Sequence, residues 1–395
     1  MATTRMRGIG LALLLVLAGG TLACSRDATA PGRASVALPA LSVTGPQVVT
    51  GVQGPGATYA LYLPAEWNHE LVLFAHGWSA AAPPLPAANY MPAPLRDGLL
   101  AAGYGVAMSS FTYGGFAVKD AMVRTAQLKD LFTENFGAPT RTYLMSISLG
   151  ASVVMRMAEQ NPNKYAGVMP ICGIVAGVPF QLNHYFNTRV LFDYYYPGVL
   201  EGNAIDNPPA LTAAASAAVS AALNADLTKA QKLADIDQIR MSYSNDAEMV
   251  ADILFALTFN AMDVFTDDLK LVTHGRSFFD NTNVYYTGSG EDATLNAGVQ
   301  RFAADPDAAN MVENLYSPSG DLKIPVLTLH TRADPIVPLR HETALADLVA
   351  TKGASGFLLT RVYEGNVHCG IPLASELAAF QDLATWARTG VKPQS

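Results

Sequence analysis

Ser148 lies where the sequence predicts a sharp turn between a buried strand and a helix. Residues 142–145 are apolar and β-prone, and residues 149–159 carry apolar side chains at helical spacing. A serine at such a turn exposes its hydroxyl, and the residues two positions away on either side must be small so that strand and helix can approach closely. Ser146 and Gly150 meet this demand. The stretch therefore predicts a nucleophilic serine, with an ordinary strand-to-helix turn as the alternative.

Two further residues have the chemistry needed to activate a serine hydroxyl. Asp334 and His368 each follow a predicted strand, in the segments TRADPIVP and EGNVHCG. A histidine can accept the serine proton and later donate it to the leaving group. A carboxylate can hold the imidazole in the required tautomer and stabilise the imidazolium. These three residue types predict acyl transfer through a covalent intermediate. The alternatives are that Asp334, which precedes a proline, is a turn residue and that His368 is a surface histidine.

Other acids and histidines fit this chemistry less well. Asp292 and Asp321 are rival acids, but neither directly follows a convincing apolar strand. His76 and His330 lie at or in predicted strands, which favours a role in the core or in positioning a loop. The remaining histidines show no pattern that indicates a role.

Predicted strands and helices alternate around these residues. Strands are expected at 57–63, 70–75, 104–109, 142–145, 167–172, 324–330 and 356–363, and helices at 95–102, 119–136, 149–159, 342–350 and 374–388. Nearly continuous apolar strands that alternate with helices are typical of a parallel sheet covered on both faces. The predicted fold class is therefore α/β. The candidate residues follow the carboxyl ends of strands, where open α/β sheets bind their ligands.

The alternation stops after Gly173 and resumes near residue 323. The intervening segment is rich in alanine, has helical periodicity at 210–223 and 248–262, and contains the aromatic run Tyr194 to Tyr196. A segment of this length between two strands is too long for a loop. We expect residues 36–173 and 323–392 to form the α/β core and residues 174–322 to form an inserted helical cap domain. Its aromatic side chains would serve substrate binding or core packing.

The amino terminus has the features of an export signal. Arg5 and Arg7 precede a short apolar run, and Ala23 stands before Cys24. We expect residues 1–23 to be a signal peptide and residues 24–35 to be a flexible tether. The Ala23-Cys24 pair resembles a bacterial lipoprotein cleavage site. Two outcomes therefore stay open: membrane anchoring at the bacterial envelope through a lipidated Cys24, or cleavage and release into the periplasm or the medium.

The composition and charge of the chain limit the classes of function that it can have. A chain of 395 residues with 50% hydrophobic and 15% charged residues can build a large core. The net charge of −8 becomes −10 without the two arginines of the predicted signal peptide, so the sequence gives no electrostatic footprint for nucleic acid. Gly288 and Gly290 lack the third spaced glycine of a dinucleotide site, and no cysteine/histidine cluster indicates a metal. No cofactor is expected, and the sequence carries no signal for an oligomeric state.

Two cysteines remain besides Cys24. Cys172 ends a predicted strand, and Cys369 adjoins the candidate base His368. In an oxidising compartment two leftover thiols can pair. We hypothesise a disulfide that pins the histidine loop, with two unpaired buried thiols as the alternative.

The order of these features resembles the α/β-hydrolase superfamily. In that family a histidine-glycine pair follows an early strand, the nucleophile sits at an elbow after a central strand, an acid follows a later strand, and the histidine comes last. The matching residues are His76-Gly77-Trp78, Ser148, Asp334 and His368, although Ser146 replaces the first glycine of the family's G-x-S-x-G pattern. The resemblance covers about residues 57–390 apart from the insertion. It implies that the backbone N–H groups of Leu149 and Trp78 form the oxyanion hole.

These observations predict an exported serine hydrolase that cleaves a carboxylic ester, in a small molecule or a polymer, through an acyl-enzyme. The cap would close over an apolar or aromatic part of the substrate. One alternative is an exported aminopeptidase of the same fold, which would need an acidic cluster in the cap; Glu201, Asp206, Glu291 and Asp292 are the candidates. Another is a non-catalytic surface protein that uses the pocket for binding.

Overall fold

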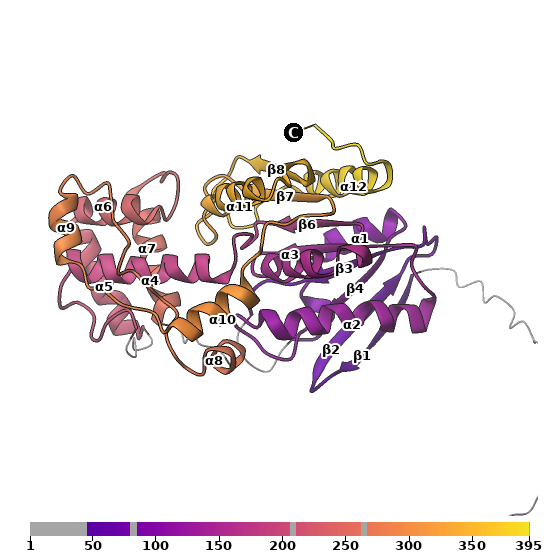
Figure 1. Cartoon of the computed structure of the whole chain (residues 1–395), viewed down its shortest axis with the longest axis horizontal. Helices are drawn as coiled ribbons and strands as arrows, with labels where there is room; N and C mark the ends of the chain where they lie inside the picture. The colour runs from indigo at the N-terminus through magenta and orange to yellow at the C-terminus, as the bar shows by residue number, and fades with distance from the viewer. Residues whose placement is uncertain (1–45, 80–84, 206–210, 262–266, 395) are drawn as a thin grey trace, which may run out of the picture. The chain divides into compact units, whose positions relative to one another are not determined.

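The computed structural model describes residues 46–79, 85–205, 211–261 and 267–394 (Figure 1). The predicted signal peptide and tether, including Cys24, lie outside these residues, and so does Asp206. No helix in the described ranges is long and apolar enough to cross a membrane.

A mixed sheet of eight strands lies at the centre of the described chain, in the order β1-β2-β4-β3-β5-β6-β7-β8. β1 pairs antiparallel with β2, β2 pairs antiparallel with β4, and all other neighbours are parallel. The strand bounds are β1 Gln47–Gln53, β2 Ala57–Leu63, β3 Glu70–Ala75, β4 Gly105–Ser109, β5 Arg141–Ile147, β6 Gly167–Ile171, β7 Val326–Thr331 and β8 Leu358–Tyr363. The predicted α/β class with a mostly parallel sheet is confirmed.

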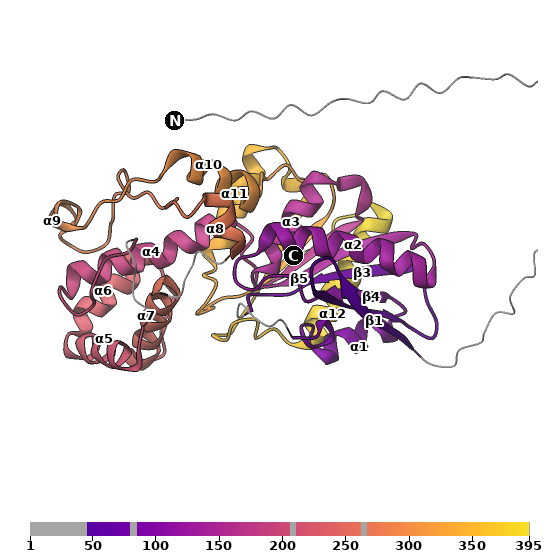
Figure 2. The ribbon, with the colours of Figure 1, turned by 90° about the horizontal axis from the view of Figure 1, so that it is seen from below.

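Helices cover both faces of this sheet. Leu71 and Leu73 of β3 belong to one core cluster, together with residues of α2 (Val118–Phe136), α3 (Gly150–Gln160) and α11 (Arg340–Thr351). Val72 and Phe74 belong to the other cluster, together with residues of α1 (Ala93–Ala101) and α12 (Leu373–Thr389) (Figure 2). Successive side chains of a strand point to opposite faces, and β3 is buried along its whole length. This burial on two faces explains why the central strands read as continuous apolar runs.

Strand β1 was not among the predicted strands. Val48 and Val52 are more than half exposed, at 53% and 67%, because β1 lies at the edge of the sheet. Its sequence QVVTGVQ therefore carries no continuous apolar run. The other seven strands lie where the sequence predicts them, and every end is within two residues of its predicted position.

Between β6 and β7 the described residues form helices and loops but no strand. The helices are α4 Val178–Tyr195, α5 Ala213–Ala225, α6 Leu227–Asp237, α7 Asp246–Ala261, α8 Asp267–Thr273, α9 Asp292–Gly298 and α10 Pro306–Tyr316. Helix α4 packs against α6 and α7, and α10 packs against α2 and α3. The helices expected at 210–223 and 248–262 correspond to α5 and α7. Tyr195 and Tyr196 are buried, which favours core packing for this aromatic run. The bounds of a cap domain stay a prediction.

Candidate active site

Ser148 occupies a strained turn between β5 and α3. Its φ angle is +51°, in the left-handed region that side chains other than glycine rarely adopt. Its N–H donates to the carbonyl of Ile171 over 3.0 Å, and its own carbonyl accepts from the N–H groups of Ala151 and Ile174. These bonds hold the turn against the end of β6. The predicted sharp turn at Ser148 is confirmed, and its side chain is half-buried.

The two small residues around Ser148 serve different needs. A Cβ atom at Gly150 would lie 2.2 Å from the carbonyl oxygen of Ala75, so only glycine fits there. Ser146 lies inside β5, level with Ala75 on one side and Pro170 on the other. It is fully buried, and its hydroxyl has no hydrogen-bond partner within the described chain. The turn thus depends on the second glycine of the family pattern and accepts serine in place of the first.

Asp334 and His368 come together although they follow different strands. The imidazole Nδ1–H donates to Asp334 Oδ2 over 2.8 Å and lies 3.0 Å from Oδ1. The Asp334 side chain is buried, whereas that of His368 is 17% exposed. In a neutral imidazole, donation from Nδ1 leaves Nε2 unprotonated and able to accept a proton. The structure therefore brings together the predicted acid and base in the tautomer that general-base chemistry requires.

The segment after Asp334 is held from two sides. Oδ1 of Asp334 accepts hydrogen bonds of 2.9 Å from the N–H groups of Ile336 and Val337. His330 of β7 contacts this segment, because its Nε2–H donates to the carbonyl of Val337 over 2.9 Å. From helix α4, the side chain of Gln181 donates to the carbonyl of Ile336 over 3.0 Å. His330 is fully buried, in agreement with its predicted positioning role.

A disulfide joins Cys172 to Cys369, with Cα atoms 5.1 Å apart. The hypothesised bridge is therefore present in the structure. Cys172 directly follows β6, which lies between the strand before Ser148 and the strand before Asp334. Cys369 directly follows His368, so the bridge fixes the histidine loop over the end of β6. The two sulfur atoms and a ring nitrogen of His368 lie within 4.8 Å of one another, but sulfurs bonded to each other are not thiolate ligands for a metal.

The hydroxyl of Ser148 makes no hydrogen bond to another residue of the described ranges. Ser148 is instead tied through its backbone to Ile171, the residue before Cys172. Catalytic hydrogen bonds are often long without substrate and shorten in the reacting complex. A serine hydroxyl also reorients by rotation about one bond. The structure thus places Ser148 at the end of β5, beside the end of β6, and its hydroxyl forms no hydrogen bond to His368.

The loop after β3 abuts the serine turn. A Cβ atom at Gly77 would lie 3.0 Å from Cβ and 3.6 Å from Oγ of Ser148. This contact places the neighbouring residue Trp78 close to the turn. The N–H groups of Trp78 and Leu149 donate to no carbonyl or side chain of the described residues. Two free donors next to one hydroxyl are what an oxyanion hole requires, and their role stays a prediction.

His76 fixes the conformation of this loop. Its ring is stacked between Tyr90 and Phe111, with centroid distances of 3.8 and 3.9 Å. Its Nδ1–H donates to the carbonyl of Gly77 over 2.7 Å. Burial lowers the pKa of His76 to about 4, and the hydrogen bonds to the backbone oppose this effect only in part. His76 is therefore a neutral core histidine at physiological pH, as the sequence favours.

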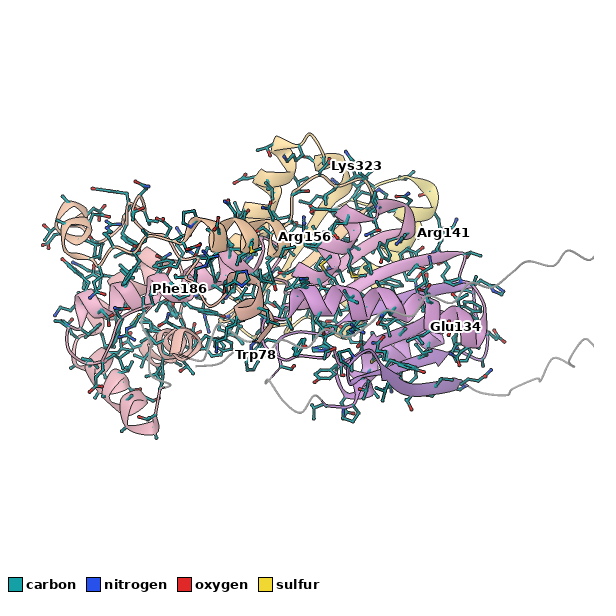
Figure 3. The ribbon with its side chains drawn as sticks, turned by 60° about the horizontal axis from the view of Figure 1, so that its bottom comes forward. Trp78, Glu134, Arg141, Arg156, Phe186 and Lys323 are labelled. Carbon is teal, nitrogen blue, oxygen red and sulfur yellow. A yellow bond between two sulfur atoms is a disulfide. The ribbon has the colours of Figure 1, made fainter. Side chains whose placement is uncertain are left out.

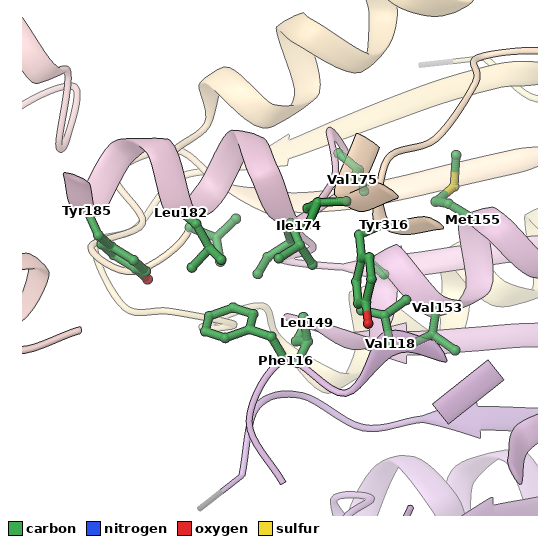
Figure 4. Close-up of a cluster of buried hydrophobic side chains, with 14 of the residues drawn as sticks. Phe116, Val118, Leu149, Val153, Met155, Ile174, Val175, Leu182, Tyr185 and Tyr316 are labelled. Atoms are coloured by element: carbon green, nitrogen blue, oxygen red, sulfur yellow. The ribbon is translucent and has the colours of Figure 1, made fainter. Parts of the chain in front are cut away.

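Apolar side chains surround the turn from the insertion side. Leu149 is buried in the same cluster as Phe116 from the loop after β4 and Leu182 and Tyr185 from α4 (Figure 4). Trp78, labelled in Figure 3, packs edge-on against Phe259 of α7, with ring centroids 5.4 Å apart. Phe259 in turn stacks on Tyr185 at 5.2 Å. Trp78, Phe259 and Tyr185 thus form an aromatic wall beside the serine. The sequence alone showed only that the insertion is rich in aromatic residues.

Glu248 and Asp252 of α7 form an ion cluster with Arg240 from the connection before α7, and this cluster contacts the histidine loop. Asn366, two residues before His368, donates to Glu248 over 3.2 Å. Arg240 lies 2.7 Å from Asp252 and 3.3 Å from Glu248. Burial raises the pKa of Asp252 to about 6, although Arg240 acts in the opposite direction. These residues were not predicted from the sequence, because the periodicity of a helix does not show which loop its polar face contacts.

The rival acids lie elsewhere. Asp292 accepts hydrogen bonds from Ser289 at the start of α9, and Asp321 pairs with Lys323 at 2.6 Å. Neither contacts His368 among the described residues. Glu201 and Glu291, proposed for an amino-terminal binding cluster, are exposed.

No protein-family model matches the sequence, and no curated protein matches it. Among solved structures, the chain is similar to feruloyl esterase B from Aspergillus oryzae (14% identity, TM-score 0.47, covering 88% of this chain and 81% of that chain). It is also similar to an esterase from Aspergillus oryzae (13% identity, TM-score 0.47, covering 88% of this chain and 80% of that chain). A third similar structure is a monoacylglycerol lipase from Paleococcus ferrophilus (16% identity, TM-score 0.38, covering 84% of this chain and 98% of that chain). These are similarities of backbone arrangement, and the chemistry of the site follows from its own residues.

Proposed function

We propose that this chain, whose mostly parallel sheet and serine turn are those of the α/β-hydrolase superfamily, is an exported serine hydrolase that cleaves carboxylic esters. The observation that carries the proposal is the hydrogen-bonded pair of Asp334 and His368, at 2.8 Å, in the same sheet as the strained turn at Ser148. Only β6 separates the strand before Ser148 from the strand before Asp334, and Cys172 at the end of β6 is bridged to Cys369. In this pair the buried carboxylate fixes one imidazole nitrogen, and the partly exposed ring keeps its other nitrogen available to take a proton from a nucleophile.

In the proposed reaction, His368 Nε2 takes the proton of Ser148 Oγ as that oxygen attacks the ester carbonyl carbon. The carbonyl oxygen becomes an oxyanion, which accepts hydrogen bonds from the N–H groups of Leu149 and Trp78. The imidazolium then donates its proton to the alkoxide, and the alcohol leaves. Water, deprotonated by His368, attacks the acyl-enzyme in the same way and releases the carboxylic acid together with the free Ser148 hydroxyl.

The aromatic wall favours an apolar or aromatic acyl group. Trp78, Phe259 and Tyr185 offer flat apolar surfaces next to the turn, and such surfaces gain most from burying apolar substrate area. An ester also suits the site better than a charged amino terminus, because Glu248, the acid of the insertion that contacts the histidine loop, is already paired with Arg240. Export is proposed from the amino-terminal sequence alone. Either Cys24 is lipidated and anchors the protein to the membrane, or the signal peptide is cleaved and the protein is released.

The test is a panel of p-nitrophenyl esters of graded acyl length, assayed on the wild type and on Ser148→Ala. We expect Ser148→Ala to lower kcat by about 10⁴–10⁶-fold. Ser146→Ala is the matched control, since Ser146 is a buried serine of the same segment whose hydroxyl has no partner in the described residues. A fluorophosphonate probe should label the wild type and Ser146→Ala but not Ser148→Ala. Activity on aminoacyl anilides without activity on esters would instead support the peptidase, and equal labelling of all three proteins would exclude Ser148 as the nucleophile.

A further inference from the structure

A cavity separate from the candidate active site lies between the connection of α6 to α7 and the start of α11. Its volume is about 430 Å³, and its walls include Gln238, Arg240, Met241, Leu339 and Arg340. Ser148, His368 and Trp78 do not line it. Pro338, which also lines the cavity, lies four residues after Asp334.

The guanidinium of Arg340 has unused hydrogen-bonding capacity in this cavity. Its Nε is buried and has no hydrogen-bond partner, and none of its N–H groups donates to another described residue. The nearest carboxylate oxygen is that of Asp237, at 3.9 Å. The guanidinium carbon lies 5.5 Å from the ring centre of Phe180, which fixes its plane from one side. A guanidinium offers five N–H donors, so an unbonded one in a half-buried position is unusual.

The neighbouring charges engage Arg340 only through the long ion pair with Asp237. Arg240 is already paired with Asp252 at 2.7 Å and with Glu248 at 3.3 Å. Asp237 accepts one hydrogen bond from Thr188 and lies 2.9 Å from the ring of His184, so its carboxylate is engaged inside the insertion. Asp235 lines the cavity but is exposed and accepts from Gln231. Arg340 is thus the one cavity cation, among the described residues, without a close ion-pair partner.

We propose that this cavity binds a monocarboxylate with an apolar body, held by Arg340. The guanidinium fork matches the two oxygens of a carboxylate, and Met241, Pro338 and Leu339 supply apolar surface for the rest of the molecule. A single negative charge fits better than a phosphate dianion, because the carboxylates of Asp235 and Asp237 are close. This site does not depend on Ser148 acting as a nucleophile.

Calorimetric titration of the full chain with benzoate, and with the neutral isostere benzamide, tests the proposal. Benzoate should bind saturably with one site per chain, and benzamide should bind at least about tenfold more weakly because it lacks the charge. Arg340→Gln removes the guanidinium. Thr343→Trp places a large side chain in the cavity from an exposed position on α11, where folding is not at risk. Arg361→Gln, on β8 and paired with Asp382, is the matched control.

Both cavity variants should weaken benzoate binding by at least about tenfold, and Arg361→Gln should leave it within about twofold of the wild type. Equal binding of benzoate and benzamide would overturn the proposal, and so would unchanged benzoate binding by Thr343→Trp. Absence of any saturable benzoate binding by the wild type at millimolar concentration would overturn it as well.

Discussion

His368 Nδ1 lies 2.8 Å from Oδ2 of Asp334, and the same carboxylate accepts two backbone N–H groups. The backbone hydrogen bonds therefore orient the carboxylate independently of the imidazole, and the carboxylate holds the imidazole in one tautomer. Replacement of one carboxylate oxygen by an amide nitrogen would present a donor to the ring. The tautomer with the proton on Nε2 would then be favoured, and this tautomer cannot accept the Ser148 proton.

Asp334→Asn is accordingly expected to lower kcat by about 10⁴-fold with little change in fold. Steady-state hydrolysis of p-nitrophenyl esters measures this loss, and circular dichroism checks the fold. Asp321→Asn removes an exposed carboxylate that pairs with Lys323 and serves as the control. Near wild-type kcat in Asp334→Asn would remove Asp334 from the proposed triad.

The bridge between Cys172 and Cys369 closes a loop of 197 residues. A cross-link over such a length removes much conformational entropy from the unfolded chain. The double variant Cys172→Ser/Cys369→Ser should therefore lose about 2–5 kcal/mol of unfolding free energy. It should also lose kcat, because the loop that carries His368 is no longer fixed over β6. Urea unfolding of the oxidised wild type against the double variant measures the first effect, and an unchanged midpoint would contradict it.

Gly77 and Ser148 are close enough that a single methyl group at Gly77 would meet the serine. Its Cβ would lie 3.0 Å from Ser148 Cβ, so Gly77→Ala must shift either the serine or the loop that carries the N–H of Trp78. We expect kcat to fall by about 10²–10³-fold, the loss typical of one misplaced oxyanion donor. Gly356→Ala, where a Cβ atom meets open space, is the control. A kcat within twofold of the wild type in Gly77→Ala would place the oxyanion hole elsewhere.

The parts of this site that could be predicted are those encoded in short stretches of sequence. The turn at Ser148 depends on the apolar strand before it and on Gly150 after it, both within five residues, and the central strands are buried on both faces. β1 was missed because an edge strand is half exposed. The contact of Glu248 with Asn366 was missed for another reason: 118 residues separate the partners. Such pairings depend on how the insertion packs, which no local periodicity encodes.

Glu376 on α12 gives a pH-dependent prediction that is independent of catalysis. Burial raises the pKa of its carboxyl from 4.5 to about 7, and no neighbouring charge opposes this effect. Below pH 4.5 the carboxyl is protonated in both the folded and the unfolded chain. As the pH rises from 4.5 to 7, the unfolded chain loses this proton first, so the free energy of unfolding falls and then stays constant. The fall is about 1–3 kcal/mol, because solvent near the partly exposed carboxyl reduces the cost of its charge.

Glu376→Gln resembles the protonated side chain at every pH and should not show this fall. The variant should therefore unfold with a higher free energy than the wild type above pH 7, and the difference should shrink to near zero by pH 4.5. Urea unfolding of both proteins between pH 4.5 and 8 measures the difference at each pH, with Glu134→Gln on an exposed part of α2 as the control. A difference that does not change with pH would mean that Glu376 is ionised in the folded protein, and the burial of its carboxyl would then cost much less than the structure indicates.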